Sequence, residues 1–398
     1  MQLGIHAGFV RFRSMVVRWA IVLSCLWLGI SQAKDRIWVP VKINGKRAQF
    51  IFDTGAYCPL FCGRAVAERF GLWVTDPPTN AVPAPGQVLT GETEEFSLKM
   101  WGARVRAQFR VYDAPKGVHM DSDGVIGWGC VVSNIIQIDA TRQKVACFDR
   151  LPKQVATWTK IPLHTNSDIL HLEFSQGGNT NELVEVDTGD TVGVALSPDK
   201  WRAWRAAHPK QPLTLHRFFM GGSGWVVKEE AWAKELSLGP LVLTDVPVTE
   251  ASPTQVTIGS PQFGASLGMA ALKRLDLIVD APHGMAYLRP KTTRPQAYQH
   301  NRLGAVFAQP APQGKGMVAQ VVDGSPAYEA GVRNGDVLSH VTIHWGLIPR
   351  LTLRHFPDDE FQRGPAGTKL DLTLNRGGKT LKATAILRDI VAPGDAKP

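Results

Sequence analysis

Two aspartates in this 398-residue sequence stand at the same place in a repeated tripeptide, and each follows a predicted strand. Asp53 begins the tripeptide at residues 53–55, and Asp187 begins the identical Asp-Thr-Gly at residues 187–189. An ionised carboxylate at the end of a buried strand is costly unless it is hydrogen-bonded or shares a proton. Two carboxylates held about 3 Å apart cannot both ionise, so together they hold one proton at moderately acid pH.

A carboxyl pair that shares one proton can hydrolyse an amide bond by general acid–base catalysis without a covalent intermediate. The ionised member takes a proton from a water molecule, and the protonated member donates to the oxygen of the scissile carbonyl. The residues after each aspartate have physical uses in such a site. The hydroxyls of Thr54 and Thr188 can hydrogen-bond across to the opposite half of the site. Gly55 and Gly189 let a backbone amide approach the carboxylate.

The sequence around the two tripeptides is duplicated. Each tripeptide is preceded by a hairpin-like segment, with an Asn-Gly turn at residues 44–45 in the first copy. Ile126-Gly127 precedes Asp139 by a fixed interval, and Leu267-Gly268 precedes Asp280 by the same interval. Such a duplication predicts two similar lobes that each deliver one aspartate to a shared site.

Short apolar strands separated by Gly, Pro and Asn turns occur throughout both halves, which predicts a mainly β fold with few helices. One helix is expected at residues 62–70 and is ended by Gly71. A second helix is expected at residues 201–207, with Ser197 as its N-cap residue and Pro198 opening it.

These motifs resemble those of aspartic proteases, specifically the bacterial retropepsin-like type that carries both lobes in one chain. The matching segments are IFDTGA at 51–56, VEVDTGD at 184–190, Val-Ile-Gly at 125–127 and Ser-Leu-Gly at 266–268. In the family, the last two kinds of segment pack behind the active aspartate of their own lobe. The resemblance covers residues 36–292.

The resemblance implies two acid-protease-type β lobes, at residues 36–150 and 160–292, that form one active-site cleft. By it, Asp53 and Asp187 are the catalytic dyad of an enzyme that cleaves polypeptides and uses no cofactor and no metal. The supporting residues that it implies are Thr54, Gly55, Thr188, Gly189, Ile126, Gly127, Leu267 and Gly268. Each lobe of the family can also carry a flexible flap over the substrate, for which residues 85–92 and 219–225 are the candidates.

Two residues of the second copy depart from the family pattern. Asp190 stands where the family usually has Ala, Ser or Thr, and Ser266 replaces an apolar residue. A third carboxylate near the dyad is expected to disfavour the ionised form of the dyad, or else to prevent its assembly. Both departures support an alternative in which the protease fold is inactive.

The last part of the chain, residues 300–392, resembles a PDZ domain and follows a polar, Pro-containing linker at 290–302. Its motifs include VVDGSPAYEAGVRNGDVL, in which Ser325 caps a short helix. The resemblance implies a carboxylate loop and first groove strand formed by Leu303, Gly304, Ala305, Val306 and Phe307. A peptide carboxyl terminus could add there as an extra strand, opposite a helical wall at 351–363. The alternative is a module that only packs on the lobes.

Residues 1–33 have the pattern of a secretory signal peptide. Arginines precede an apolar run at residues 19–30, and Ser31-Gln32-Ala33 follows it. The sequence therefore predicts export, to the periplasm or outside the cell. An uncleaved membrane anchor is the alternative, and Cys25 leaves a lipid-modified amino terminus as a further one.

The charge of the chain does not indicate a nucleic-acid partner. The formal net charge is +9, and removing residues 1–33, which hold three arginines and no acidic residue, lowers it to +6. The remaining basic residues are spread along the chain without a dense run or aromatic interleaving, so we expect a solvated basic surface.

The cysteines that remain after residue 33 are Cys58, Cys62, Cys130 and Cys147. An even number in an oxidising compartment suggests disulfides. Pairing Cys58 with Cys62, and Cys130 with Cys147, is the simplest of the three possible pairings. Their spacing does not resemble a zinc site.

Three hypotheses about function fit these features. The first is an exported aspartic endopeptidase whose PDZ-like module recruits or regulates polypeptide substrates. The second is an inactive protease-fold scaffold that binds protein carboxyl termini through the PDZ-like module. In the third, the first lobe pairs with the first lobe of another chain, and the enzyme is a dimer.

Overall fold

The computed structural model describes most of the chain after residue 34. The described residues are 35–56, 58–77, 88–113, 122–165, 167–175, 181–220, 224–252, 262–292, 298–308, 317–344, 351–353 and 360–391. The predicted signal peptide lies outside them, as do residues 85–87 of the first flap candidate and 221–223 of the second. The described chain is mainly β, as predicted.

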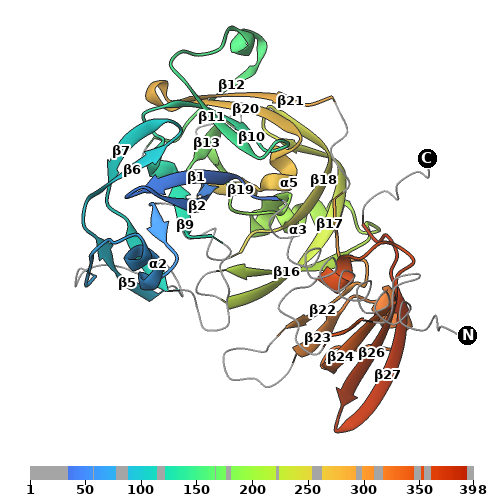
Figure 1. Ribbon diagram of the computed structural model, residues 1–398. Coiled ribbons are helices and arrows are strands. Elements are labelled where there is room, and N and C mark those ends of the chain that lie inside the picture. The colour runs from blue at the N-terminus through green and yellow to red at the C-terminus, as the bar shows by residue number, and fades with distance from the viewer. Residues whose placement is uncertain are drawn as a thin grey trace, which may run out of the picture.

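A nine-stranded sheet, which we call the first-half sheet, contains the first Asp-Thr-Gly strand (Figure 1). Its strands are β1 (Trp38–Ile43), β2 (Lys46–Asp53), β3 (Leu60–Phe61), β4 (Val74–Thr75), β5 (Val88–Thr93), β6 (Phe96–Met100), β7 (Ala103–Ala107), β8 (Arg110–Asp113) and β9 (Gly124–Gly127). They lie in the order β4-β5-β8-β3-β9-β2-β1-β6-β7. The strand that ends in Asp53 is therefore an interior strand, between β1 and β9.

A seven-stranded sheet, which we call the second-half sheet, contains the second Asp-Thr-Gly strand. Its strands are β13 (His171–Ser175), β14 (Asn181–Val186), β15 (Val194–Leu196), β16 (Thr214–Met220), β17 (Gly224–Leu238), β18 (Leu241–Glu250) and β19 (Phe263–Leu267). They lie in the order β13-β14-β19-β15-β18-β17-β16. Asp187 follows directly after β14, which is again an interior strand.

The two sheets repeat the same strand order and the same strand directions. In the first-half sheet, β1 runs antiparallel to β2, β2 runs parallel to β9, and β9 runs antiparallel to β3. In the second-half sheet, β13, β14, β19 and β15 follow one another in the same relation. The duplication in the sequence is therefore a duplication of the fold, and it places Asp53 and Asp187 at matching positions.

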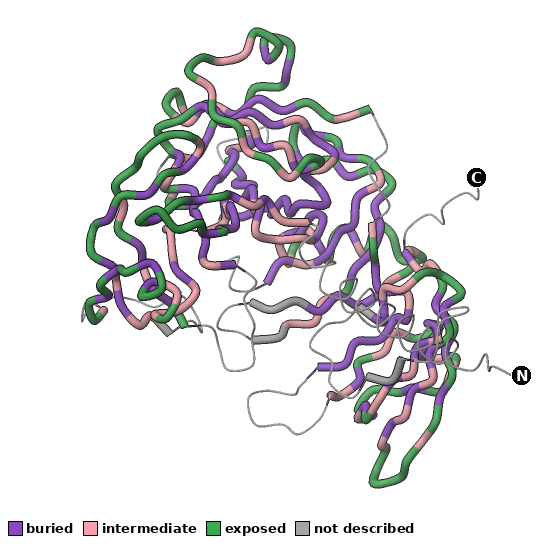
Figure 2. Tube along the Cα trace, viewed as in Figure 1, coloured by how far each residue is buried: buried purple, intermediate pink, exposed green. Residues whose placement is uncertain are grey.

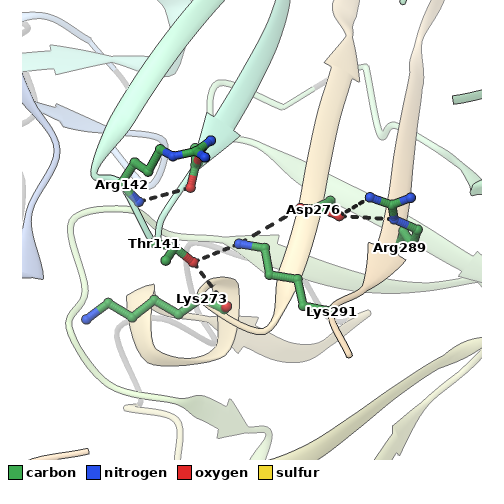
Figure 3. Close-up of polar contacts among 7 residues, drawn as sticks. Thr141, Arg142, Lys273, Asp276, Arg289 and Lys291 are labelled. Carbon is green, nitrogen blue, oxygen red and sulfur yellow. Dashed lines mark hydrogen bonds and ion pairs between the residues drawn. The ribbon is translucent and has the colours of Figure 1, made fainter. Parts of the chain in front are cut away.

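A five-stranded sheet is shared between the two halves. Its strands are β10 (Ile135–Asp139), β11 (Lys144–Phe148), β12 (Thr159–Pro162), β20 (Leu275–Asp280) and β21 (Met285–Pro290), in the order β11-β10-β20-β21-β12. Polar contacts at one end of this sheet also join the halves, as Figure 3 shows. Thr141 Oγ1 accepts a hydrogen bond of 2.7 Å from Lys291 Nζ and donates to the Lys273 carbonyl oxygen at 3.4 Å.

One apolar core fills the space among the first-half, shared and second-half sheets. Phe50 and Phe52 of β2 belong to the same buried cluster as Val184 and Val186 of β14. Figure 2 shows that buried residues concentrate where the two halves meet. Burying both Asp-Thr-Gly strands in one core holds their carboxyl ends in a fixed relation.

The two expected helices are present. Helix α2 spans Arg64–Arg69 and ends before Gly71, which has a φ of +75°. Helix α3 spans Pro198–Ala207, but the Ser197 hydroxyl makes no capping hydrogen bond there. The helix instead begins with a proline, which has no N–H to satisfy. Within the described ranges, no helix is long and apolar enough to cross a membrane.

A six-stranded C-terminal sheet has its own apolar core. Its elements are β22 (Ala305–Ala308), β23 (Met317–Val321), α6 (Pro326–Glu329), β24 (Val337–His344), β25 (Leu351–Leu353), η6 (Glu360–Arg363), β26 (Lys369–Arg376) and β27 (Lys379–Ile386). The predicted cap of the short helix is confirmed, because Ser325 Oγ accepts a hydrogen bond from Tyr328 N at 3.3 Å.

The predicted helical wall at 351–363 is wrong in its first part. Residues 351–353 form strand β25, paired with β24, because Leu-Thr-Leu alternates as a strand does, whereas Glu360–Arg363 is a 3-10 helix. At the end of the predicted linker, two residues pack against the fold. His300 and Asn301 are buried, because their polar groups bond to neighbouring parts of the fold.

The expected disulfides are absent as well. Cys58, Cys62, Cys130 and Cys147 are all free thiols. Cys130 lies close enough to Cys58 for the charge of Cys58 to raise its pKa. Burial raises the pKa of the Cys130 thiol to about 12, which keeps this thiol in its unreactive protonated form.

Candidate active site

The two threonines of the Asp-Thr-Gly tripeptides join the first-half and second-half sheets. Thr54 N donates a hydrogen bond to Thr188 Oγ1 at 3.0 Å, and Thr188 N donates to Thr54 Oγ1 at 3.1 Å. Each hydroxyl donates in turn to a carbonyl of the other strand, Thr54 to Val186 O at 2.5 Å and Thr188 to Phe52 O at 2.8 Å. Both threonines are fully buried. The expected contact across the halves is therefore present, with near two-fold symmetry.

The two aspartates meet directly above this contact. Gly55 N donates to Asp53 Oδ1 at 2.9 Å, and Gly189 N donates to Asp187 Oδ1 at 2.8 Å. The two carboxyl groups also lie close enough that each shifts the pKa of the other. Each carboxylate is thus oriented by the amide of its own glycine and faces the carboxylate of the other half.

Gly55 and Gly189 also make room for the carboxylate of the opposite half. A Cβ atom added to Gly55 would lie 2.7 Å from Asp187 Cγ, and one added to Gly189 would lie 2.3 Å from Asp53 Oδ2. Both distances are shorter than a real Cβ allows. A glycine is therefore required at each position for the two aspartates to approach one another. The sequence had explained these glycines only by the approach of their own backbone amides to the carboxylates.

The apolar-Gly segments lie behind the tripeptides. Ile126 and Leu267 are fully buried in β9 and β19, and Asp187 N donates to Leu267 O at 3.0 Å. A Cβ atom on Gly127 would lie 2.7 Å from Ala56 O, and one on Gly268 would lie 2.5 Å from Val192 O. These four residues thus support the turns that carry the aspartates.

Burial raises the pKa of Asp53, and it raises the pKa of Asp187 well above its ordinary value, where the charge of Asp53 adds to it. The positive charge of Arg36 acts in the opposite direction and favours the ionised form of Asp53. Because the pKa is raised for both members, the pair favours one shared proton over two negative charges.

Asp190 belongs to the same group of carboxylates. Its backbone N donates to Asp187 Oδ1 at 3.1 Å, and its own Oδ1 accepts from Val192 N at 3.1 Å. Burial raises the pKa of Asp190 to about 6. Its negative charge raises the pKa of Asp187, which is the effect that the sequence predicts for a third carboxylate.

Glu185 is a fourth carboxylate that sequence reasoning missed. It is 6% exposed on β14, two residues before Asp187, and burial raises its pKa to about 8. In the sequence it is hidden inside an apolar strand. Placing the two tripeptides in register would have revealed it, because the matching residue of the first half is Ile51.

Other candidate features are only partly described. Residues 88–92 of the first flap candidate belong to β5. Of the second candidate, residues 219–220 end β16 and residues 224–225 begin β17, and these two strands pair antiparallel. Within the described ranges, no group of three or more His, Cys, Asp or Glu side chains could hold a metal ion.

The predicted peptide-binding stretch packs against the second-half sheet. Leu303, Ala305, Val306 and Phe307 are each at most 1% exposed, and Gly304 has a φ of +68°. Strand β22 contacts β16 and β17, and Figure 1 shows the C-terminal sheet beside this hairpin. The residues predicted to form a carboxylate loop and groove strand are therefore covered by the second-half sheet.

Two side chains make hydrogen bonds to the backbone of the stretch that was predicted to bind a peptide. Asn301 Oδ1 accepts from Leu303 N at 2.9 Å and Gly304 N at 3.0 Å, and Asn301 Nδ2 donates to Ala305 O at 2.8 Å. Arg217 Nη1, from β16, donates to Phe307 O at 2.8 Å. Residues two apart in a strand face the same way, so both carbonyls lie on one edge of β22. A peptide that adds at this edge has to displace both side chains.

The same interface buries a carboxyl group. Tyr298 Oη donates to Glu230 Oε2 at 2.6 Å, and Glu230 is 2% exposed. Burial raises the pKa of Glu230 to about 7, against the lowering effects of Tyr298 and Arg363. Because the folded-state pKa is raised, the folded protein binds this proton more tightly than the unfolded chain does.

We expect the free energy of unfolding to fall as the pH rises from about 4.5 to about 7, by roughly 3 kcal/mol from Glu230 alone. Denaturant unfolding at about pH 5 and about pH 8 measures this change. Glu230→Gln should lose that part of the pH dependence, and its exposed neighbour Glu229→Gln should keep it. Identical pH dependence in the two variants would contradict the assignment.

The sequence comparison connects this site to a known family. Residues 39–129 match the aspartyl protease family. The matched segment includes the first Asp-Thr-Gly tripeptide together with Ile126 and Gly127, whereas the second tripeptide lies outside it. This part of the chain is therefore similar to aspartyl proteases.

Comparison with solved structures finds the retroviral protease-like domain of Ddi1 from Leishmania major. It is 21% identical, over 30% of this chain and 95% of that chain, with a TM-score of 0.24. A TM-score this low does not by itself establish a shared fold. None of the curated proteins matches the chain.

Proposed function

We propose that this chain is an aspartic endopeptidase in which Asp53 and Asp187 form a shared-proton catalytic dyad. The observation that carries the proposal is the symmetric meeting of the two Asp-Thr-Gly tripeptides, in which the threonines exchange hydrogen bonds and each aspartate lies against the glycine of the other tripeptide. Two acidic groups from two repeated halves have no structural reason to converge in a buried place.

The proposed reaction is the hydrolysis of a peptide bond by a water molecule held between the carboxyl groups. In this proposal Asp187 is the member that holds the shared proton, and it donates that proton to the scissile carbonyl oxygen. Asp53 takes a proton from the attacking water, so that a tetrahedral diol forms without a covalent bond to the enzyme. A proton then passes from Asp53 to the leaving amine, and Asp187 recovers its own as the diol collapses.

The experiment that tests this proposal is digestion of a peptide library by residues 34–398 at about pH 3 to 7. Cleavage at defined sequences, detected by mass spectrometry, is the expected result. Absence of cleavage in the whole library and at every pH would favour the alternative of an inactive protease-fold scaffold.

We also propose that the chain is exported by residues 1–33, and that the C-terminal module is a PDZ domain that recruits or regulates substrates. The covered edge of β22 suggests that the module alternates between two states. In the docked state, strand β22 packs against strands β16 and β17, and Arg217 is hydrogen-bonded to its edge. In the undocked state a protein carboxyl terminus adds to it.

Removing the Arg217 contact should therefore expose the groove strand. We expect Arg217→Ala to raise the affinity for carboxyl-terminal peptides about tenfold, because it shifts the module by about 1.4 kcal/mol toward the undocked state. Fluorescence anisotropy with a library of labelled peptides measures this change. Arg202→Ala, on the exposed face of α3, is the matched control. Equal peptide affinities in wild type and Arg217→Ala would contradict the two-state proposal.

A further inference from the structure

Three polar side chains form a row across the second-half sheet, beside Asp187. His171 of β13 pairs in register with Glu185 of β14, and Glu185 pairs in register with Ser266 of β19. Residues that are directly opposite on neighbouring strands point to the same face of a sheet. Residues two apart in a strand also share a face, so the row lies on the face of β14 that leads to Asp187.

The first-half sheet has apolar side chains at the matching positions. Trp38 of β1 pairs with Ile51 of β2, and Ile51 pairs with Val125 of β9. Ile51 and Val125 are buried, but they lie outside the apolar cluster that contains their neighbours Phe50 and Phe52. This face is therefore directed away from the main core in both halves. The two sides of the aspartate pair thus differ in chemistry.

The row contains polar atoms that have no partner in the described part of the chain. Ser266 and His171 are 1% and 2% exposed, yet Ser266 Oγ and His171 Nε2 make no hydrogen bond of normal geometry. Buried polar atoms without a partner are costly and rare. Two of them beside one buried carboxyl group indicate that a polar ligand completes the arrangement.

The chemistry of the row is that of hydrogen-bond acceptors. His171 Nδ1 lies 2.8 Å from Ser167 Oγ, and when Nδ1 donates there, Nε2 presents a lone pair. Burial lowers the pKa of His171 to about 4, so the ring is neutral above that pH. Glu185 offers carboxyl oxygens, and the nearby hydroxyl of Ser266 lowers its pKa against the larger raising effect of burial.

We propose that His171, Glu185 and Ser266 bind the ammonium group of a lysine side chain next to the bond that is cleaved. An ammonium group has three donors and no acceptor, and the row offers three kinds of acceptor. It is also a compact charge, unlike the planar guanidinium of arginine, and it would restore the ionised form of the buried Glu185. Ile51 and Val125 take an apolar side chain on the other side of that bond. This inference rests on the proposed peptidase function.

Peptides that differ only in lysine or norleucine test the inference, because norleucine keeps the apolar stem and lacks the ammonium group. Each residue is placed on the amino side and on the carboxyl side of a cleaved bond. Wild type should favour lysine over norleucine at least tenfold in kcat/KM, on one side only. The double variant Glu185→Ile and Ser266→Val, which installs the first-half pair, should lose or reverse this ratio.

Two further variants make the test decisive. Glu185→Gln keeps the shape and removes the charge, so it should lower the ratio even where the double variant folds poorly. Glu173→Gln lies on the same face of β13 but outside the row, and it should leave the ratio unchanged. A ratio that is equal in wild type and Glu185→Gln would overturn the inference.

A binding measurement separates this inference from the proposed function. Affinities of the lysine and norleucine peptides for Asp187→Asn can be compared by fluorescence anisotropy, with and without Glu185→Gln. If the wild type cleaves nothing but Asp187→Asn binds lysine peptides more tightly in a way that depends on Glu185, the lysine-binding inference stands and the proposed peptidase function is wrong. Cleavage without any such preference would keep the peptidase and overturn the row.

Discussion

Asp187→Asn and Asp53→Asn are each expected to lower kcat/KM for peptide cleavage at least about 10³-fold, because general acid–base catalysis contributes rate factors of this size. Asparagine has nearly the same shape as aspartate, so the amides of Gly55 and Gly189 still find an oxygen acceptor. The substitution removes only the ability to exchange the shared proton. Steady-state cleavage of one library-derived peptide is the measurement.

The control for this loss is another half-buried aspartate at a strand end. Asp139 ends β10 and accepts a hydrogen bond from Arg142 N. It has no role in the proposed reaction, so the Asp139→Asn variant should cleave peptides at the wild-type rate. The result also separates a single-chain site from a dimer. If Asp187→Asn cleaved normally and its specific activity rose with protein concentration, Asp53 would be pairing with Asp53 of a second chain.

Thr188→Val is expected to weaken both the fold and the activity. The substitution leaves Thr54 N without an acceptor and Phe52 O without a donor, and both groups are buried. We expect the free energy of unfolding to fall by about 2–4 kcal/mol, because each unsatisfied buried group costs about 1–3 kcal/mol. We also expect kcat to fall about 100-fold, since a shift of about 1 Å between reacting groups has an effect of this size.

Thr188→Ser is the matched control, because it keeps the hydroxyl and loses only a methyl group. Its stability and kcat should stay close to those of wild type, whereas Thr54→Val should repeat the defect by symmetry. Denaturant unfolding and steady-state kinetics give the two readouts. Equal behaviour of the Val and Ser variants would show that the crossed hydrogen bonds do not hold the aspartates in place.

The core of the site could be predicted because a repeat constrains a fold more strongly than a single motif does. One Asp-Thr-Gly after an apolar strand has many explanations. Two copies, each followed by an apolar-Gly segment at the same interval, require matching strands and a shared site. The structure accordingly gives β2 and β14 the same neighbours and the same directions.

Other features could not be predicted because they depend on contacts between distant residues. Glu185 lies in a strand whose other central residues are apolar, so the sequence does not mark it as a site residue. Its proposed role depends on His171 and Ser266, which lie beside it on neighbouring strands. Tyr298 and Asn301 belong to a polar run that has the composition of a linker. They are held in place by Glu230 and Leu215, which no local pattern connects to them.

The pH dependence of kcat/KM for a single cleaved peptide tests the shared-proton dyad most directly. A pair that must hold one proton is active between its two macroscopic pKa values, so the account predicts a bell-shaped profile with an acid limb and an alkaline limb. Because the ionised form of Asp190 raises the pKa of Asp187, the alkaline limb should move to lower pH when Asp190 is replaced by Asn. A rate that is constant with pH, or that falls on one side only, would contradict the shared proton.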